Sequence, residues 1–195
     1  MRYLLLAILA MVSMGAVAGS YSRGHTIAYY DQGSDYFYQG VVEVKAGHLL
    51  QGRSIENKNL YIYNTQTDQG KLLFQSRVDG KITDLIFEQA FMVVPSNGSG
   101  YMSIQKQCYT CIKNNNGIKQ REPANRIIIV TLKTMDKGET LILYVAKKDG
   151  SELQELARFD PATVSWHIDV KHEVLRLIEQ KQDTIVVQNK PLPNF

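Results

Sequence analysis

The sequence is poor in the residues from which most catalytic and metal-binding sites are built. It contains two cysteines, four histidines and one tryptophan in 195 residues. It has no Gly-x-Ser-x-Gly, no His-Glu-x-x-His and no phosphate-loop pattern. The segment 136–139 has too few alternating oxygen ligands for a calcium loop. We therefore expect neither a metal ion nor a cofactor.

Strong charge imbalance and long hydrophobic runs are also lacking. The chain has 22 Lys and Arg against 19 Asp and Glu, and a formal net charge of +3. No basic cluster is dense enough to bind a phosphate backbone, and no run after the N-terminus reaches the length of a membrane span. We expect no nucleic-acid partner and no transmembrane segment.

The N-terminus has the pattern of an export signal. Arg2 precedes an apolar run over 3–14, and Ala16-Val17-Ala18 supplies the small residues that signal peptidase recognises. The run is too short to span a bilayer, although an uncleaved anchor is the alternative. We predict a signal peptide over 1–18 and a single β-rich domain over 19–195, located in the periplasm or secreted.

Strand signals dominate the rest of the chain. Only five prolines interrupt it, and eleven tyrosines favour strands. The run 127–132 is almost wholly apolar and predicts a central strand buried on both faces. The segment 172–182 suits a helix and a strand equally well. The expected strands are 26–30, 36–38, 41–45, 60–63, 71–74, 82–87, 91–94, 127–132, 141–145, 153–159, 164–170 and 185–188.

Two stretches of the sequence repeat each other at a constant spacing. The first is Leu60–Tyr63, Asp68 and Leu72, and the second is Leu141–Tyr144, Asp149 and Leu153. Each unit predicts a strand, a hairpin turn, a second strand and then two more strands. The predicted fold is therefore mainly β, with antiparallel blade-like or sandwich sheets, two repeat-like units and little helix.

The second unit also has the features of a known repeat. Tyr144, the Asp149-Gly150 turn and Leu156 are followed by Trp166-His167-Ile168-Asp169. This pattern resembles the blades of TolB-type β-propeller repeats, over roughly 60–94 and 141–188. The resemblance implies four-stranded antiparallel units. A closed propeller needs at least four blades, which this chain could barely supply, so a sandwich or an open stack of blade-like sheets is the alternative.

The two cysteines stand together as Cys108-Tyr109-Thr110-Cys111. In an exported protein this pair predicts a structural disulfide. A redox centre would need the first cysteine at a helix N-terminus, and the Asn-rich stretch after Cys111 does not favour a helix. Half of a zinc site is the third possibility, but no second cysteine pair or nearby histidine completes it.

One histidine and one carboxylate stand two residues apart, at His167 and Asp169. Alternate residues of a strand share a face, so this pair, with His172 close by, could form a metal site or the acid–base site of a hydrolase. The competing interpretation, which we favour, is an ordinary solvated strand face whose opposite side packs on the core.

A group of aromatic residues brackets the polar turn at 31–35 and forms a possible binding surface. Clustered tyrosines can stack on sugars or anchor a protein partner, or can simply pair across the strands of one hairpin. The group consists of Tyr29, Tyr30, Tyr36, Phe37 and Tyr38.

From the sequence we expect an exported, non-enzymatic β-rich domain that binds a protein or glycan partner of the cell envelope, or acts there as an accessory protein. Its loops at the ends of a rigid scaffold would provide the variable surface. The alternative is an exported enzyme, either a thiol–disulfide protein that uses Cys108 and Cys111 or a hydrolase that uses His167 and Asp169.

Overall fold

The computed structural model describes residues 26–31, 33–45, 53–88, 111–114, 117–120, 123–136 and 138–195, with the backbone alone for 111–114 and 117–120. The predicted signal peptide at 1–18, the expected strand at 91–94 and Cys108 lie outside these residues.

The described chain consists of strands and turns, and its strands pair antiparallel throughout, which confirms the mainly β prediction. It has no helix of the length and apolarity that crossing a membrane requires. The strands are β1 (Ala28–Asp31), β2 (Tyr36–Lys45), β3 (Ser54–Asn64), β4 (Gln69–Leu72), β5 (Lys81–Phe87), β6 (Cys111–Asn114), β7 (Gly117–Gln120), β8 (Ile127–Met135), β9 (Gly138–Ala146), β10 (Gln154–Phe159), β11 (Val164–Asp169), β12 (Val174–Lys181) and β13 (Thr184–Pro191).

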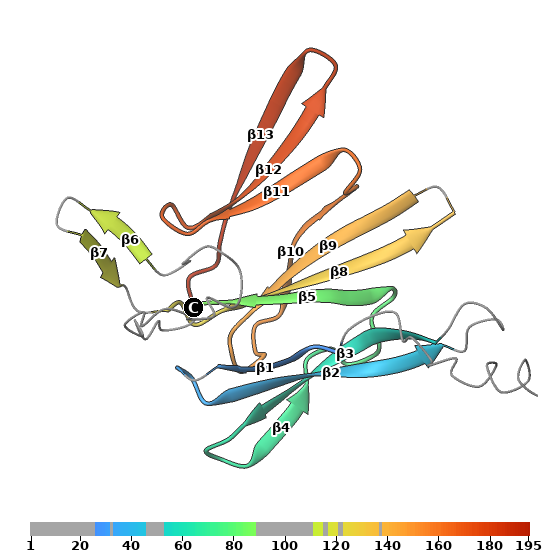
Figure 1. Cartoon of the computed structure of the whole chain (residues 1–195), viewed down its shortest axis with the longest axis vertical. Helices are drawn as coiled ribbons and strands as arrows, with labels where there is room; N and C mark the ends of the chain where they lie inside the picture. Colours follow the sequence, from blue (N-terminus) through green and yellow to red (C-terminus); the bar gives the residue numbers. More distant parts are fainter. Residues whose placement is uncertain are drawn as a thin grey trace, which may run out of the picture.

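The strands form three stacked layers and a small separate hairpin (Figure 1). An eight-stranded sheet runs in the order β1-β2-β3-β5-β8-β9-β10, with β4 paired to β3. A single residue pair, Asn57 with Ile82, joins β3 to β5, so the sheet folds there into two layers. The third layer is the sheet β11-β12-β13, and β6 and β7 form the separate hairpin.

A hydrophobic core lies on each side of the middle layer. On one side, Ile127 and Ile129 of β8 pack with Leu60 and Ile62 of β3. On the other side, Ile128 and Val130 pack with residues of the third layer, such as Leu175. The run Ile127–Thr131 is buried at every position, because its two faces belong to different cores. The prediction of a central strand buried on both faces is confirmed.

The two repeat-like units correspond in their hairpins and then differ. β3 pairs with β4 and β9 pairs with β10, each as an antiparallel hairpin. The next strand of the first unit, β5, stays in the same sheet and pairs with β8. The next strand of the second unit, β11, begins the third layer. The segment 172–182, for which the sequence suits a helix and a strand equally well, contains the strand β12. Leu175 and Leu177 lie on the buried face of this strand.

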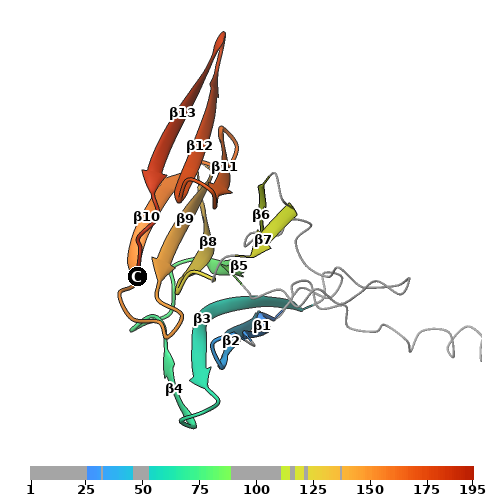
Figure 2. The same ribbon diagram turned by 90° about the vertical axis from the view of Figure 1, so that its left-hand side faces the viewer.

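Gly80 lies at a tight turn before β5 and close to the neighbouring strand β8. Its φ is +114°, and a Cβ added there would lie 2.3 Å from the carbonyl oxygen of Leu132 on β8. The backbone can therefore approach β8 only without a side chain. Figure 2 shows the stack from the side, with the β12–β13 hairpin extending away from the rest.

We predict that Gly80→Ala destabilises the fold by more than Gly138→Ala does. Gly138 has a similar φ of +139°, but a Cβ there would meet no atom within 4 Å. The control substitution therefore carries the conformational cost alone, about 1–3 kcal/mol. Urea unfolding followed by circular dichroism measures both. Equal costs for the two variants would contradict the close approach of Gly80 to β8.

Candidate functional site

The outer face of the first layer carries a row of aromatic side chains. Phe37 of β2 pairs with Tyr30 of β1 on one side and with Tyr63 of β3 on the other. Tyr61 lies two residues before Tyr63, on the same face of β3, and pairs with Leu72 of β4. We call these five residues the aromatic face.

Part of this face is open to solvent. Tyr30 is 44% exposed, Tyr61 37% and Leu72 51%, whereas Phe37 and Tyr63 are half-buried. The ring of Tyr61 lies against Gly70, where an added Cβ would come within 2.3 Å of the tyrosine hydroxyl. Gly70 thus lets the ring lie close to the sheet.

The aromatic group expected from the sequence divides between the two faces of the β1–β2 hairpin. Tyr38 is fully buried, and Tyr29 and Tyr36 pack against the same core. Tyr30 and Phe37 point the other way, because alternate residues of a strand face opposite sides. The aromatic face therefore includes two of the five expected residues. It gains Tyr61 and Tyr63, which sequence reasoning assigned only to a strand.

Two turns at the end of the aromatic face are tied to each other. The Thr65 amide donates to the carbonyl oxygen of Asp35 at 2.9 Å, and the Gln66 side chain donates to the Asp35 carboxylate at 2.6 Å. The Tyr63 hydroxyl donates to Asp68, and this hydrogen bond raises the pKa of Tyr63 above its usual value. These contacts fix the hairpins that carry the aromatic rings.

A buried ion pair holds the first hairpin to the middle layer. The Lys148 ammonium lies 2.7 Å from the Asp31 carboxylate, and the two side chains are 5% and 0% exposed. Lys148 also donates to the carbonyl oxygen of Glu88 at 2.9 Å, and its own carbonyl oxygen accepts from Tyr38 at 3.1 Å. Burial raises the pKa of the Tyr38 phenol well above its usual value. The phenol therefore stays protonated and can donate.

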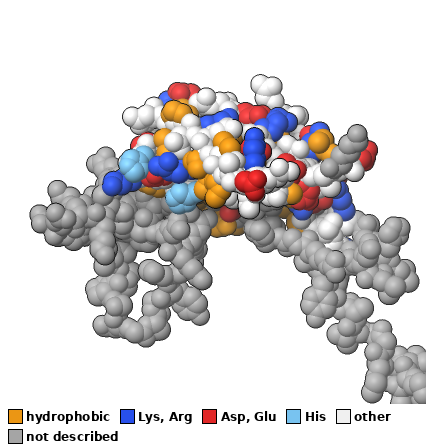
Figure 3. Space-filling model, turned by 90° about the horizontal axis from the view of Figure 1, so that it is seen from above, with side chains coloured by type: hydrophobic (Ala, Val, Ile, Leu, Met, Phe, Trp, Pro, Cys, Tyr) orange, Lys and Arg blue, Asp and Glu red, His pale blue; other side chains and the backbone are white. Residues whose placement is uncertain are grey.

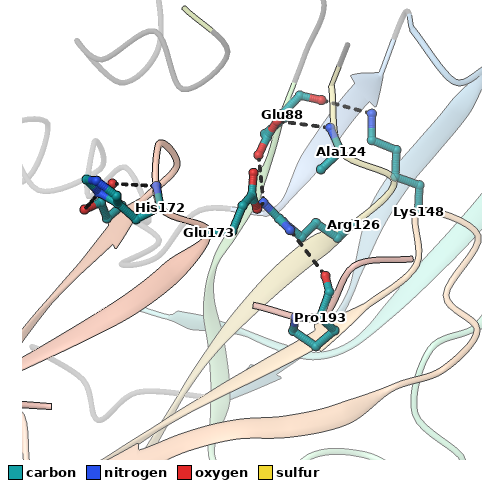
Figure 4. A network of polar contacts seen from close by, with 8 residues as sticks. Glu88, Ala124, Arg126, Lys148, His172, Glu173 and Pro193 are labelled. Carbon is teal, nitrogen blue, oxygen red and sulfur yellow. Dashed lines mark hydrogen bonds and ion pairs between the residues drawn. The ribbon is translucent and has the colours of Figure 1, made fainter. Parts of the chain in front are cut away.

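A second buried ion pair continues this network toward the third layer (Figure 4). Arg126 contacts the Glu88 carboxylate at 3.2 Å, and it also pairs with Glu173 in the β11–β12 turn. It donates further to the carbonyl oxygen of Pro193 at 3.2 Å. The charged network therefore joins all three layers at one end of the stack.

Asp169 has different partners from those expected of a His167–Asp169 pair. Its carboxylate lies 2.7 Å from Nδ1 of His172 and accepts from Arg176 at 2.6 Å. The Arg176 hydrogen bond, followed by that of His172, holds the pKa of Asp169 well below its usual range. His167 is exposed on β11 opposite Arg176. Figure 3, viewed from the third-layer side, shows histidine side chains together at one side, next to Lys and Arg.

A cleft of about 260 Å³ with several charged residues lies at the opposite end of the strands from the ion-pair network. Its charged lining consists of Lys45, Lys58, Lys81, Lys133, Glu56 and Asp79. Glu56 pairs with two of these lysines and Asp79 with a third. Three of the four lysines are therefore paired with the carboxylates of the same cleft.

The described residues contain no group of three or more His, Cys, Asp or Glu side chains placed to hold a metal ion. Cys111 opens the strand β6, whose residues pair with β7. A strand, rather than a helix, therefore follows the second cysteine, and the state of the Cys108–Cys111 pair stays a prediction.

Comparison with known proteins adds no relative: no family model, no curated protein and no solved structure matches the chain.

We predict that Lys148→Met costs about 3–5 kcal/mol of unfolding free energy, because it leaves the Asp31 carboxylate buried and unpaired. Lys147→Met is the matched control. Lys147 pairs with Glu152 at the surface, and such pairs contribute about 1 kcal/mol at most. Urea denaturation of both variants tests this, and a cost for Lys148→Met no larger than that of the control would contradict the buried pair.

Asp169 should contribute stability that depends on pH. Its folded-state pKa lies below its unfolded value, so the contribution is present above the unfolded pKa of about 3.9 and is lost as the pH falls. We predict that Asp169→Asn lowers the urea midpoint at pH 7 and that the gap to the unmodified protein narrows at pH 3. A gap of constant size at both pH values would show that the ion pair does not cause it.

Proposed function

We propose that this protein is an exported, non-enzymatic domain that binds a protein or glycan partner of the cell envelope through the aromatic face. The observation that supports this most is the row of Tyr30, Phe37 and Tyr63 across three paired strands, with Tyr61 and Leu72 exposed beside it.

The chemistry of these side chains suits binding. A tyrosine offers a large apolar ring with a polar tip, so it can stack on a sugar ring or fill a pocket on a protein while its hydroxyl stays hydrogen-bonded. Tyrosine also loses little conformational entropy when it is immobilised.

Rigidity of the surface supports the same proposal. The turns at 33–35 and 65–68 are joined by hydrogen bonds, and the buried Asp31–Lys148 pair anchors the hairpin from behind. A preformed surface pays less ordering entropy on binding than a flexible one.

Export rests on the predicted signal peptide at 1–18, and we retain the Cys108–Cys111 disulfide as part of the proposal. The non-enzymatic assignment rests on the sparse catalytic residues. Asp169 is engaged by Arg176 and His172, which makes it an ion-pair partner at a turn.

The test uses the full mature chain immobilised as bait. One arm exposes it to a panel of purified envelope glycans, and the other to detergent-solubilised envelope proteins. We predict that Tyr30→Ala combined with Tyr61→Ala weakens capture at least about tenfold, since buried tyrosines at interfaces contribute 1 kcal/mol or more each.

The matched control is Met135→Ala, because Met135 is 50% exposed on β8, away from the aromatic face. It should leave capture unchanged. Circular dichroism checks that all variants fold. Equal binding by the double variant and the control would reject the aromatic face as the binding surface.

A further inference from the structure

The outer edge of β13 is the longest regular edge in the described part of the chain. β13 ends the sheet β11-β12-β13 and pairs with β12 through eight consecutive residue pairs, from Val174–Pro191 to Lys181–Thr184. Its other side has no strand neighbour among the described residues. Such an edge presents a row of backbone donors and acceptors that can pair with another strand.

The edges at β1, β4, β10 and β11 have features that discourage strand pairing, and so does the part of β2 that extends past β1, which has a register shift between Val41 and Val42. β1 and β4 have four residues each. β10 has a register shift between Glu155 and Ala157, and β11 has six residues, with Asp169 at its end. Short length, bulges and charges all protect an edge from unwanted pairing. β13 has eight residues without a register shift, and its Lys190 and Pro191 stand at the C-terminal end, after an uncharged run over 184–189.

β13 also exposes aliphatic side chains. Ile185 is 68% exposed, the highest value among the exposed large hydrophobic residues of the described chain, and Val187 is 50% exposed. Both lie on one face, since they are two residues apart, and Val187 pairs with Ile178 of β12. Figures 1 and 2 both show this hairpin extending away from the other layers.

We propose that β13 pairs antiparallel with β13 of a second copy of this chain, so that two three-stranded sheets join into one. A two-fold interface brings the same strand from both copies together. If the two-fold axis passes at Val186, Ile185 lies opposite the partner's Val187. Val187 then lies opposite the partner's Ile185. The most exposed aliphatic residues of both copies therefore cover each other.

Charge is compatible with this register. Asp183 would face the partner's Asn189, and Lys190 would face the partner's Gln182. No two like charges meet directly, so the pairing avoids the repulsion that would otherwise weaken it. The dimer is independent of the aromatic face, which lies on the first layer, so either proposal can fail without the other.

The first experiment measures the mass of the full mature chain by sedimentation equilibrium over a range of concentrations. We expect a monomer–dimer equilibrium, and we expect Val187→Lys to raise the dimer dissociation constant at least about tenfold. The matched control is Val44→Lys, because Val44 is 56% exposed on β2. It should leave the equilibrium unchanged.

The second experiment tests the register by cross-linking. Val186 would face the partner's Val186 at the axis, where directly opposite residues come close enough for a disulfide. We expect Val186→Cys to form a covalent dimer on oxidation and Gln188→Cys to form little.

A monomer at every concentration, a dimer that survives Val187→Lys, or cross-linking of Gln188→Cys in preference to Val186→Cys would overturn the proposal. Circular dichroism confirms that each variant is folded before it is scored.

Discussion

The structure depends on one strand, β8, that is buried on both faces. Ile127 and Ile129 belong to the core shared with the first layer, and Ile128 and Val130 belong to the core shared with the third. Burial of an aliphatic side chain contributes about 1.5–3 kcal/mol to the free energy of folding. β8 therefore stabilises both cores at once, since its buried side chains are divided between them. The middle layer thereby holds the other two in place and leaves their outer faces available to solvent.

The ion-pair network adds orientation to this hydrophobic arrangement. Buried ion pairs contribute little net stability, because desolvation of the charges offsets most of their attraction. Asp31, Lys148 and Arg126 instead favour the observed arrangement of the layers, since removing either partner of a buried pair leaves the other charge buried and unpaired. The β1–β2 hairpin is held in this way, and the hairpin carries Tyr30 and Phe37. The buried Asp31–Lys148 pair, on the opposite side of the hairpin, therefore helps to position the proposed binding surface.

Much of the fold could be predicted from the sequence, because its signals are local. The apolar run at 127–132 and the Asp149-Gly150 turn depend on neighbouring residues only. The pairing of β5 with β8 could not be predicted, because the paired residues lie between 40 (Phe87 with Ile127) and 51 (Lys81 with Leu132) positions apart and apolar runs pair with one another without sequence specificity. The secondary structure of β12 was ambiguous for the same reason. Leu175 and Leu177 favour a strand only because both pack on the middle layer, which is a tertiary contact.

The candidate site was predicted in part. The β1–β2 hairpin was identified as aromatic, but alternation alone did not say which of Tyr29 and Tyr30 faces the core. Tyr61 and Tyr63 join Phe37 through strand register, which is a tertiary property. The ion pairs were also invisible, because Asp31 and Lys148 are distant in sequence and each stands beside turn residues typical of an exposed loop.

Amide hydrogen exchange of the native protein tests the central role of β8 most directly. If the two cores meet in this strand, its amides from Ile127 to Leu132 can exchange only when both cores open, so they should be the slowest in the protein. Exchange in β8 as fast as in the exposed strand β4 would contradict the central role of β8.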